Sequence, residues 1–272
     1  MVGSSTSDRP VVIVKLGGSV ITRKREVERL RPKVLARLAR EVGSGRDRSV
    51  VVLHGAGSFG HPGAHRFGLA GAPPTGSDPR LRLRGAAIVA SEVRRLHLEV
   101  LRALVRAGTS PASLPISTYA RNRAGHLVHF DPVPFTEALA RGQLPVSFGD
   151  VVPDDEWGFS ILSADTIAVS LVPALHPERV IFVSDVPGIL GPATSRPRPV
   201  LEEVTDEVVA ALRPRPGATD VTGGIRSKAE AMRVIARAGS DAGLISGLTD
   251  GALSRAIRGE TVYGSWAHAE AR

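Results

Sequence analysis

Short apolar runs alternate with longer segments of helical periodicity along most of this chain. Five runs are apolar and short enough to be buried strands: residues 11–16, 49–53, 144–148, 180–184 and 242–246. Shorter strands are predicted at 115–117, 127–128 and 261–263. Helices are predicted over 27–42, 163–175 and 228–238, and a long one after residue 79 whose apolar stripe is Val89, Val93, Leu96, Val100 and Leu104.

Alternating strands and helices predict an α/β fold with a mostly parallel central sheet covered by helices on both faces, a three-layer αβα sandwich. Nothing in the sequence repeats, and no linker separates two domains. We expect a flexible N-terminus over residues 1–10 and a single domain over 11–272. In such sheets ligands gather beyond the carboxyl ends of the strands.

Glycine-rich segments follow the first two predicted strands. They are Gly17-Gly18-Ser19 and the run from His54 to His61, which we predict to be loops, as we do 69–79. Glycine permits close backbone approach, so that successive N–H groups can converge on phosphate oxygens. One such loop is more often a plain turn, but two of them with the pair Gly223-Gly224 favour anion binding. Residues 150–158 are predicted to form a hairpin turn, and the Pro-rich stretch 191–199 a mobile loop.

Lysine is rare in this basic chain. Of 35 basic side chains only Lys15, Lys24, Lys33 and Lys228 are lysines. A lysine ammonium is a compact point charge, whereas arginine is a planar fork. We attribute Lys33 to chance. The other three lie in glycine-rich or strand-end segments, which makes them candidates for contact with phosphate.

Composition excludes several classes of protein. There are no cysteines, so disulfides and cysteine metal sites are excluded. No apolar run approaches the roughly 20 residues of a membrane-spanning helix, and the first ten residues lack the apolar segment of a secretory signal. We therefore expect a cytoplasmic protein without a membrane partner. The net charge of +8 comes from scattered arginines, so nucleic acid is not an expected partner either.

Residues 55–60 also match G-x-G-x-x-G, the fingerprint of nicotinamide-dependent oxidoreductases. That fingerprint needs a helix directly after the glycines and then a strand that ends in an acidic residue about 20 positions on. We expect the glycines to lead through His61-Pro62-Gly63 into a loop that contains Asp78, so the context disfavours this function. The Walker and protein-kinase signatures are absent from the sequence.

Taken together, the glycine-rich segments resemble the amino-acid kinase superfamily. Four segments carry the resemblance: Val14–Ser19, His54–His61, Ser184–Ile189 and Asp220–Lys228. The run H-G-x-G-S-F-G-H, together with Lys24, is similar to isopentenyl phosphate kinases in particular. The resemblance covers about residues 11–264, with an acceptor-binding half over about 11–175 and a nucleotide-binding half over about 176–266.

The resemblance implies a kinase that uses ATP and Mg²⁺ to phosphorylate isopentenyl phosphate to isopentenyl diphosphate in isoprenoid biosynthesis, with dimethylallyl phosphate as a further acceptor. It implies a homodimer and no protein metal ligands. The catalytic residues would be Lys15, Lys24, His61, Asp165 and Lys228. The nucleotide would be held by Lys15, Gly17, Gly18, Ser19, Gly57, Asp185, Gly188, Gly224 and Lys228, and the acceptor by Gly55, Ala56, Gly60, His61 and Gly149.

Particular roles follow from the resemblance and from the chemistry. Lys15 and Lys228 would contact the ATP phosphates, Lys24 would neutralise the phosphoryl group in flight, and Asp165 would orient the lysines. A phosphate acceptor is already an anion and needs no base, so His61 is interpreted as a hydrogen-bond donor to it. Ala56 stands where the family more often has glycine, which costs little if its φ is negative.

Other interpretations stay open at this point. A phosphonate kinase, such as one acting on fosfomycin, would share the lysines and the histidine, and a carboxylate kinase of the superfamily or a non-catalytic sensor are further alternatives. Asp165 could be only an N-terminal helix residue, for which Ser163 and Asp165 are both candidate N-caps. We interpret His54 as structural and leave His65 and His97 unassigned. Phe67, Leu69, Ile88 and Val89 are candidates for contact with the acceptor's tail.

Overall fold

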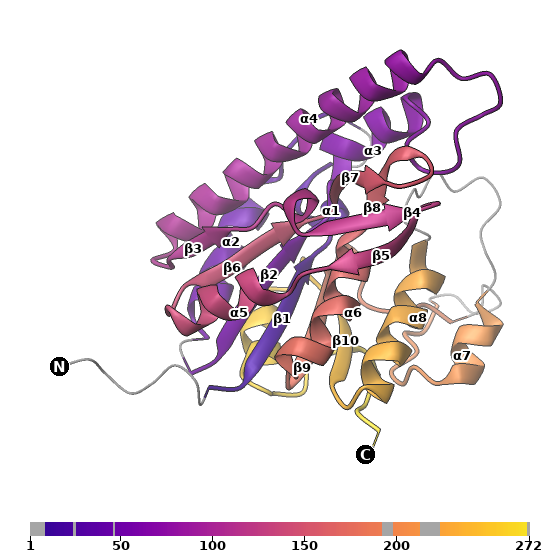
Figure 1. Cartoon of the computed structure of the whole chain (residues 1–272). Helices are drawn as coiled ribbons and strands as arrows, with labels where there is room; N and C mark the ends of the chain where they lie inside the picture. The colour runs from indigo at the N-terminus through magenta and orange to yellow at the C-terminus, as the bar shows by residue number, and fades with distance from the viewer. Residues whose placement is uncertain (1–8, 24–25, 46, 192–197, 213–223, 271–272) are drawn as a thin grey trace.

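A mostly parallel sheet with helices on both faces forms the framework of the chain, as predicted (Figure 1). The structure, a computed structural model, describes residues 9–23, 26–45, 47–191, 198–212 and 224–270. Within them seven strands pair in the order β11-β10-β9-β1-β2-β6-β3, with β11 antiparallel to β10 and the other pairs parallel. The strands are β1 (Val11–Leu16), β2 (Ser49–His54), β3 (Pro111–Ser113), β6 (Leu144–Phe148), β9 (Arg179–Ser184), β10 (Asp241–Ser246) and β11 (Gly264–Ala267).

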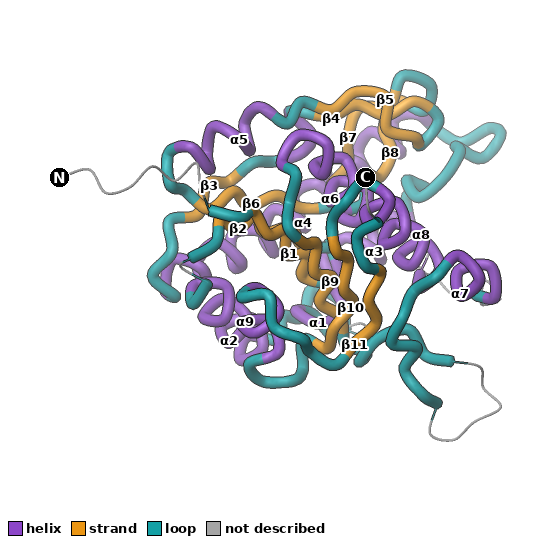
Figure 2. Tube along the Cα trace, turned by 90° about the horizontal axis from the view of Figure 1, so that it is seen from below, coloured by secondary structure: helices purple, strands orange, loops and turns teal. Residues whose placement is uncertain are grey.

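Two separate cores cover the two faces of this sheet. In β1, Val12, Val14 and Leu16 belong to one core, and Ile13 belongs to the other, because successive strand residues point to opposite faces. The first core is completed by α1 (Gly18–Ile21), α2 (Pro32–Gly43), α4 (Pro79–Arg106) and α9 (Ala252–Ile257). The second is completed by α5 (Val133–Ala140), α6 (Ala164–Leu175) and α8 (Gly224–Arg237). Figure 2 shows α2 and α9 on one side of the strands and α8 on the other. The short helix α7 (Asp206–Ala211) packs beside α8.

The predicted stripe of α4 is confirmed, because all five of its residues are buried. Ser163 is the N-cap of α6, and its hydroxyl accepts a hydrogen bond from Thr166 N–H at 3.0 Å. Asp165, the other candidate cap, lies in the first turn with its side chain turned to the interior. The cap and the acidic residue therefore have different tasks.

A second, four-stranded sheet was not predicted. Its order is β5-β4-β7-β8, with β4 (Ala120–Arg123), β5 (His126–Phe130), β7 (Asp150–Asp154) and β8 (Gly158–Leu162). Only β5 and the turn between β7 and β8 were expected. The strands are short, and β4 and β5 expose several side chains, so no apolar run marks them.

Several predicted boundaries were wrong. The helix predicted over 27–42 begins only at Pro32. Proline suits the first position of a helix, because the N–H that it lacks would have no helical partner there. The strand predicted at 115–117 is a 3₁₀ turn, η2 (Ile116–Thr118), and the paired strand β3 precedes it. The strand predicted at 261–263 lies at 264–267, and α8 begins at Gly224 rather than at Lys228. Residues 192–197 of the predicted mobile stretch, and the predicted flexible start at 1–8, lie outside the described residues.

The loop predicted over residues 54–61 is wrong from Gly57 onward, where α3 (Gly57–Arg66) begins. A helix therefore does form at the G-x-G-x-x-G glycines, and the first of our two reasons for setting that fingerprint aside was wrong. The second reason stands, because the described residues contain no strand ending in an acidic residue about 20 positions on, and Asp78 is the N-cap of α4 (Pro79–Arg106). Pro62 lies inside α3 and has no N–H for the carbonyl of Ser58, four residues earlier. That carbonyl instead accepts a hydrogen bond from Glu28 N–H at 3.1 Å. The chain thus compensates the missing helical bond with one from another segment.

Asp154 joins the turns of the second sheet. Its buried carboxylate accepts hydrogen bonds from the backbone N–H groups of Ala124, Gly125, Glu156 and Trp157 at 2.8–3.0 Å. Burial raises the pKa of Asp154, but these N–H donors outweigh it and lower the pKa to about 2. The ionised carboxylate is therefore part of the folded structure.

We predict that Asp154→Ala lowers the free energy of unfolding at pH 7 by about 2 kcal/mol, because it leaves buried donors without an acceptor. A depressed folded pKa stabilises the fold above the unfolded pKa of about 3.9, and this contribution is lost as the pH falls toward 2. Urea unfolding at pH 7, 4 and 3 measures the effect. The difference between wild type and variant should shrink with pH, and a constant difference contradicts the assignment.

Candidate active site

Glycines at the carboxyl ends of neighbouring strands lie side by side at one edge of the main sheet. Gly17 N–H donates to the carbonyl of Val183 at the end of β9 (2.7 Å), and Gly55 N–H donates to Leu16 at the end of β1 (3.0 Å). Gly149 N–H donates in turn to His54 at the end of β2 (3.0 Å). Successive strands extend the sheet from β1 to β2 and β6 on one side and from β9 to β10 and β11 on the other. Ligands of open α/β sheets bind where the strand order reverses in this way.

The two predicted phosphate loops touch each other through their backbones. A Cβ atom placed on Gly18 would lie 2.3 Å from the nitrogen of Gly57, and one placed on Gly55 would lie 2.9 Å from the nitrogen of Gly18. Gly57 has φ +51°, and a Cβ there would lie 2.3 Å from Thr22 Oγ1. Side chains would therefore separate the loops. Ala56 has φ −71°, so the departure from glycine at this position is accommodated, as expected.

Lys15 and Lys228 share one carboxylate. Lys15 Nζ lies 2.6 Å from Asp165 Oδ1, and Lys228 Nζ lies 2.7 Å from Asp165 Oδ2. Strand alternation places Lys15 on the face of Ile13, and α6 and α8, which carry Asp165 and Lys228, cover that face. The three residues come from elements far apart in the sequence, and the fold brings them together.

Burial governs the electrostatics of this cluster. Lys15 and Asp165 are 9% and 8% exposed. Burial lowers the pKa of Lys15 to about 8, although the charge of Asp165 opposes it. Burial raises the pKa of Asp165, but the two lysines outweigh it and hold that pKa far below its usual range. Both ammonium groups face one negative charge, so the cluster carries surplus positive charge suited to an anionic ligand.

Phe182 on β9 also contributes to the cluster, and sequence reasoning missed it. It is the β-ladder neighbour of Lys15, and Lys228 Nζ lies 5.0 Å from the centre of its ring. This distance permits a cation–π interaction that adds to the ion pair with Asp165. The apolar character of Phe182 in a buried strand concealed this contact.

The remaining predicted nucleotide residues surround the end of β9. Ser19 Oγ donates to Asp185 Oδ1 at 2.7 Å, which joins the first glycine loop to the segment after β9. Gly188 packs against Ser265 of β11, where a Cβ would lie 2.7 Å from the serine Oγ. Gly224 opens α8 with φ +66°. Residues 220–223 lie outside the described residues.

The predicted acceptor residues lie mainly in α3 and in the two residues directly before it. His61 lies in α3 and is half-buried, and Gly60 packs against Ala56 and Val93. Gly149 abuts the start of α6, since a Cβ on it would lie 3.1 Å from the nitrogen of Ala164. Lys24, the remaining predicted catalytic residue, lies outside the described residues.

A buried pair of histidines, His54 and His97, supports the backbone of the acceptor loop. His54 Nε2 lies 3.0 Å from His97 Nδ1, whose other ring nitrogen lies 2.8 Å from Ser113 Oγ. His54 Nδ1 lies 3.2 Å from the carbonyl of Gly55 and must donate to it, since a carbonyl only accepts. Burial lowers the pKa of His54 to about 4 and that of His97 to about 3, so both are neutral near pH 7. The interpretation of His54 as structural fits this contact, and His97 was not assigned from sequence.

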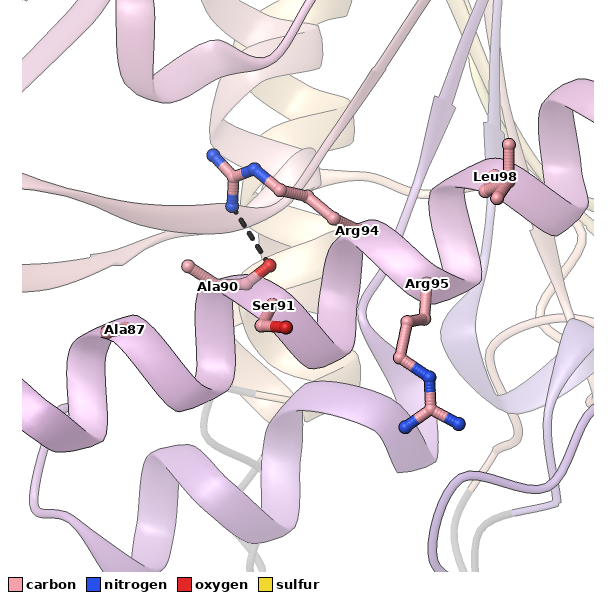
Figure 3. Close-up of a pocket in the computed structure, with 6 residues that line it drawn as sticks. All are labelled: Ala87, Ala90, Ser91, Arg94, Arg95 and Leu98. Atoms are coloured by element: carbon pink, nitrogen blue, oxygen red, sulfur yellow. Dashed lines mark hydrogen bonds between the residues drawn. The ribbon is translucent and has the colours of Figure 1, made fainter.

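A shallow, open surface patch lies elsewhere, on the outer face of α4 (Figure 3). Its lining residues all come from that helix: Ala87, Ala90, Ser91, Arg94, Arg95 and Leu98. It contains none of the predicted site residues. In the part of the chain that the structure describes, no three His, Asp or Glu side chains form a metal-binding cluster. None of the described helices is long and apolar enough to cross a membrane.

Comparison with known proteins identifies similar sequences over nearly the whole chain. The family model described as "Amino acid kinase family" matches residues 10–245. An isopentenyl phosphate kinase of Methanothermobacter thermautotrophicus is 34% identical over 266 residues, which is 94% of this chain and 98% of that protein. An isopentenyl phosphate kinase of Arabidopsis thaliana is 30% identical, over 91% of this chain and 90% of that protein.

Solved structures give the same picture. One described as "X-ray structures of isopentenyl phosphate kinase" has a TM-score of 0.82 at 32% identity and covers 94% of this chain and 99% of its own. A product complex of the T. acidophilum isopentenyl phosphate kinase has a TM-score of 0.76 at 29% identity, over 95% and 100% of the two chains. The amino-acid kinase fold expected from the glycine-rich segments is thereby confirmed.

The buried ion pairs predict an unusual titration for Lys15. In the protein without ligands its ammonium should titrate near pH 8, compared with 10.5 for an exposed lysine. Asp165→Asn should lower this pKa further, because burial and Lys228 would then act unopposed. NMR of protein with ¹³C-labelled lysine measures it, since the chain has only four lysines.

The lowered pKa of Lys15 also determines how this group changes the stability of the fold with pH. Between pH 8 and 10.5 the unfolded chain would bind more protons at Lys15 than the folded chain, so this group makes the free energy of unfolding rise with pH over that interval. Lys33→Arg, on the outer side of α2, serves as the matched control and should leave the Lys15 signal in place. A Lys15 pKa near 10.5, or one that Asp165→Asn does not change, contradicts the assignment.

Proposed function

Because the chain belongs to the amino acid kinase family, and within it to the isopentenyl phosphate kinases, we propose that it transfers the γ-phosphate of ATP to isopentenyl phosphate. The products are isopentenyl diphosphate, a precursor in isoprenoid biosynthesis, and ADP. The observation that carries the proposal is the pair of lysines on one buried carboxylate, beside two abutting glycine loops. The similarity to isopentenyl phosphate kinases over nearly the full length identifies the acceptor.

Phosphoryl transfer requires positioning and charge neutralisation more than covalent help from the protein. An oxygen of the acceptor phosphate forms the new bond to the γ-phosphorus, while the bond from that phosphorus to the β–γ bridging oxygen breaks and ADP leaves with the electron pair. Lys15 and Lys228 neutralise charge on the ATP phosphates, as Lys24 does on the group in transfer. Asp165 holds Lys15 and Lys228 in place before ATP arrives.

Backbone N–H groups of the two loops complete the phosphate contacts in this proposal. The N–H groups of Gly18 and Ser19 serve ATP and that of Ala56 serves the acceptor, with Gly57 between them. Gly17, Gly55 and Gly149 line the same loops, but their N–H groups bind the carbonyls of Val183, Leu16 and His54, so we assign them the shaping of the loops. His61 donates a hydrogen bond to the acceptor phosphate. No residue removes a proton from the acceptor, because a phosphate monoester is already an anion near neutral pH.

Mg²⁺ fits this chemistry as a companion of ATP rather than as a ligand of the protein. Both oxygens of Asp165 are paired with lysines, and the described residues contain no metal-binding cluster. Mg²⁺ readily binds through substrate phosphates and water, where it would neutralise phosphate charge. The residues around the ATP phosphates, including Asp185 and Gly188, would then need to supply only space and orientation.

Further expectations accompany the proposed activity. Dimethylallyl phosphate differs from isopentenyl phosphate only in the position of its double bond, so we expect it to be accepted. A homodimer and a cytoplasmic location stay predictions. Fosfomycin is the alternative acceptor, because a phosphonate would use the same lysines and the same histidine.

We predict rapid ADP release from ATP and Mg²⁺ with isopentenyl phosphate, and little with fosfomycin, N-acetylglutamate or no acceptor. His61→Ala should lower kcat/KM for isopentenyl phosphate by about 100-fold, since it removes a donor to the acceptor phosphate. His65→Ala, an exposed histidine on the same helix, is the matched control. Turnover with fosfomycin alone would move the protein to the phosphonate kinases, and equal activity of His61→Ala and wild type would remove the role of His61.

A further inference from the structure

A buried hydroxyl bridges the two glycine loops. Thr22, at the end of α1, has no exposed surface. Its Oγ1 donates to the carbonyl of Gly18 at 2.7 Å and accepts the N–H of Ser58 at 3.0 Å. Gly18 belongs to the first glycine loop, where α1 begins, and Ser58 lies in the first turn of α3, where the second loop ends. One oxygen therefore joins the loop proposed for ATP to the loop proposed for the acceptor.

Ser58 extends this connection to a third segment. Its Oγ accepts the N–H of Arg29 at 3.1 Å, and its carbonyl accepts the N–H of Glu28 at 3.1 Å. The carbonyl is available because Pro62, four residues on, has no N–H to offer. Ser58 is itself buried, so water does not compete for these bonds.

Backbone hydrogen bonds join this third segment, which includes Glu28 and Arg29, to the end of α1. Thr22 and Leu30 form an antiparallel bridge, and Arg23 N–H donates to the carbonyl of Arg29 at 2.8 Å. Arg31 N–H donates to Ile21 at 2.8 Å. Hydrogen bonds therefore join residues 21–23 and 28–31 to each other and to Ser58.

We propose that Thr22 and Ser58 are positioning residues that set the spacing between the donor and acceptor phosphates. The inference rests on the proposed function, because it assigns ATP to the first loop and the acceptor phosphate to the second. In-line transfer is sensitive to that spacing, and a displacement of about 1 Å can cost on the order of 100-fold in rate. The two side chains contact no reacting atom and act only through the loop backbones.

A hydroxyl that only satisfies its own helix would show a different pattern. Threonine often donates to the carbonyl four residues earlier, as Thr22 does to Gly18. The bond from Ser58 N–H spans 36 residues of sequence and joins a different loop. The lack of a Cβ at Gly57 makes room for it, since a Cβ there would lie 2.3 Å from Thr22 Oγ1.

The test compares Thr22→Val, which keeps the shape and removes the hydroxyl, with Thr22→Ser, which keeps the hydroxyl. We expect kcat with ATP and isopentenyl phosphate to fall by about 100-fold in Thr22→Val, with both KM values within about threefold of wild type. Thr22→Ser should recover most of that loss. In Ser58→Ala, which removes only the acceptor of Arg29 N–H, kcat should fall by about tenfold.

Ser240→Ala is the matched control for loss of a buried hydroxyl. Ser240 Oγ donates to the carbonyl of Pro177 at the opposite end of the sheet, so this variant should lose stability but keep its kcat. Urea unfolding of every variant separates the two effects. A folded Thr22→Val with wild-type kcat, or a Thr22→Ser as slow as Thr22→Val, overturns the proposal.

Amide hydrogen exchange gives a second readout that needs no turnover. The N–H of Ser58 should exchange slowly in wild type and in Thr22→Ser, and at least tenfold faster in Thr22→Val and in Thr22→Ala. Unchanged exchange overturns the proposal even if one variant folds poorly. Wild-type protein that lacks activity with isopentenyl phosphate would refute the proposed acceptor instead, and the same variants would then be compared with the acceptor that the panel identifies.

Discussion

A lysine buried in the central strand of the sheet requires a buried carboxylate, and much of the site depends on this requirement. Lys15 lies between the chains of β2 and β9, where an unpaired charge would cost several kcal/mol. Asp165 supplies the opposite charge, and Lys228 shares it. Since the three residues come from β1, α6 and α8, the ion pairs hold both helices against one face of the sheet as well as holding the charges ready for phosphate.

Close contact between backbones is the second condition for the site. The first and second glycine loops approach so closely that side chains at Gly18 or Gly57 would collide with backbone atoms or with Thr22. The glycines therefore serve the packing of one loop on the other in addition to the approach of a ligand. Ala56 is tolerated between these glycines because its backbone has an ordinary helical conformation and its Cβ packs beside Gly60.

Support for the loops comes from residues that show no chemical signature in the sequence. His54 and His97 are neutral and hold the carbonyl of Gly55, while Thr22 and Ser58 join the backbones of two loops. Each of these side chains acts on the backbone of a neighbour. A rigid frame of this kind suits a reaction in which geometry and charge, rather than an acid or a base, carry the rate.

Local sequence determined five strands of the main sheet (β1, β2, β6, β9 and β10), the stripe of α4 and the cap of α6, because apolar periodicity and capping depend on residues close together in the chain. It also marked Lys15, Asp165 and Lys228 as candidates, through rare lysines and a family resemblance. Tertiary structure decided what the periodicity does not encode. Pro62 is accommodated in α3 because the N–H of Glu28 binds the carbonyl of Ser58 that Pro62 leaves free. The hydroxyl of Thr22 accepts the N–H of Ser58, which is 36 residues away in the sequence. Such contacts depend on which segments the fold places side by side, and therefore only the folded chain shows them.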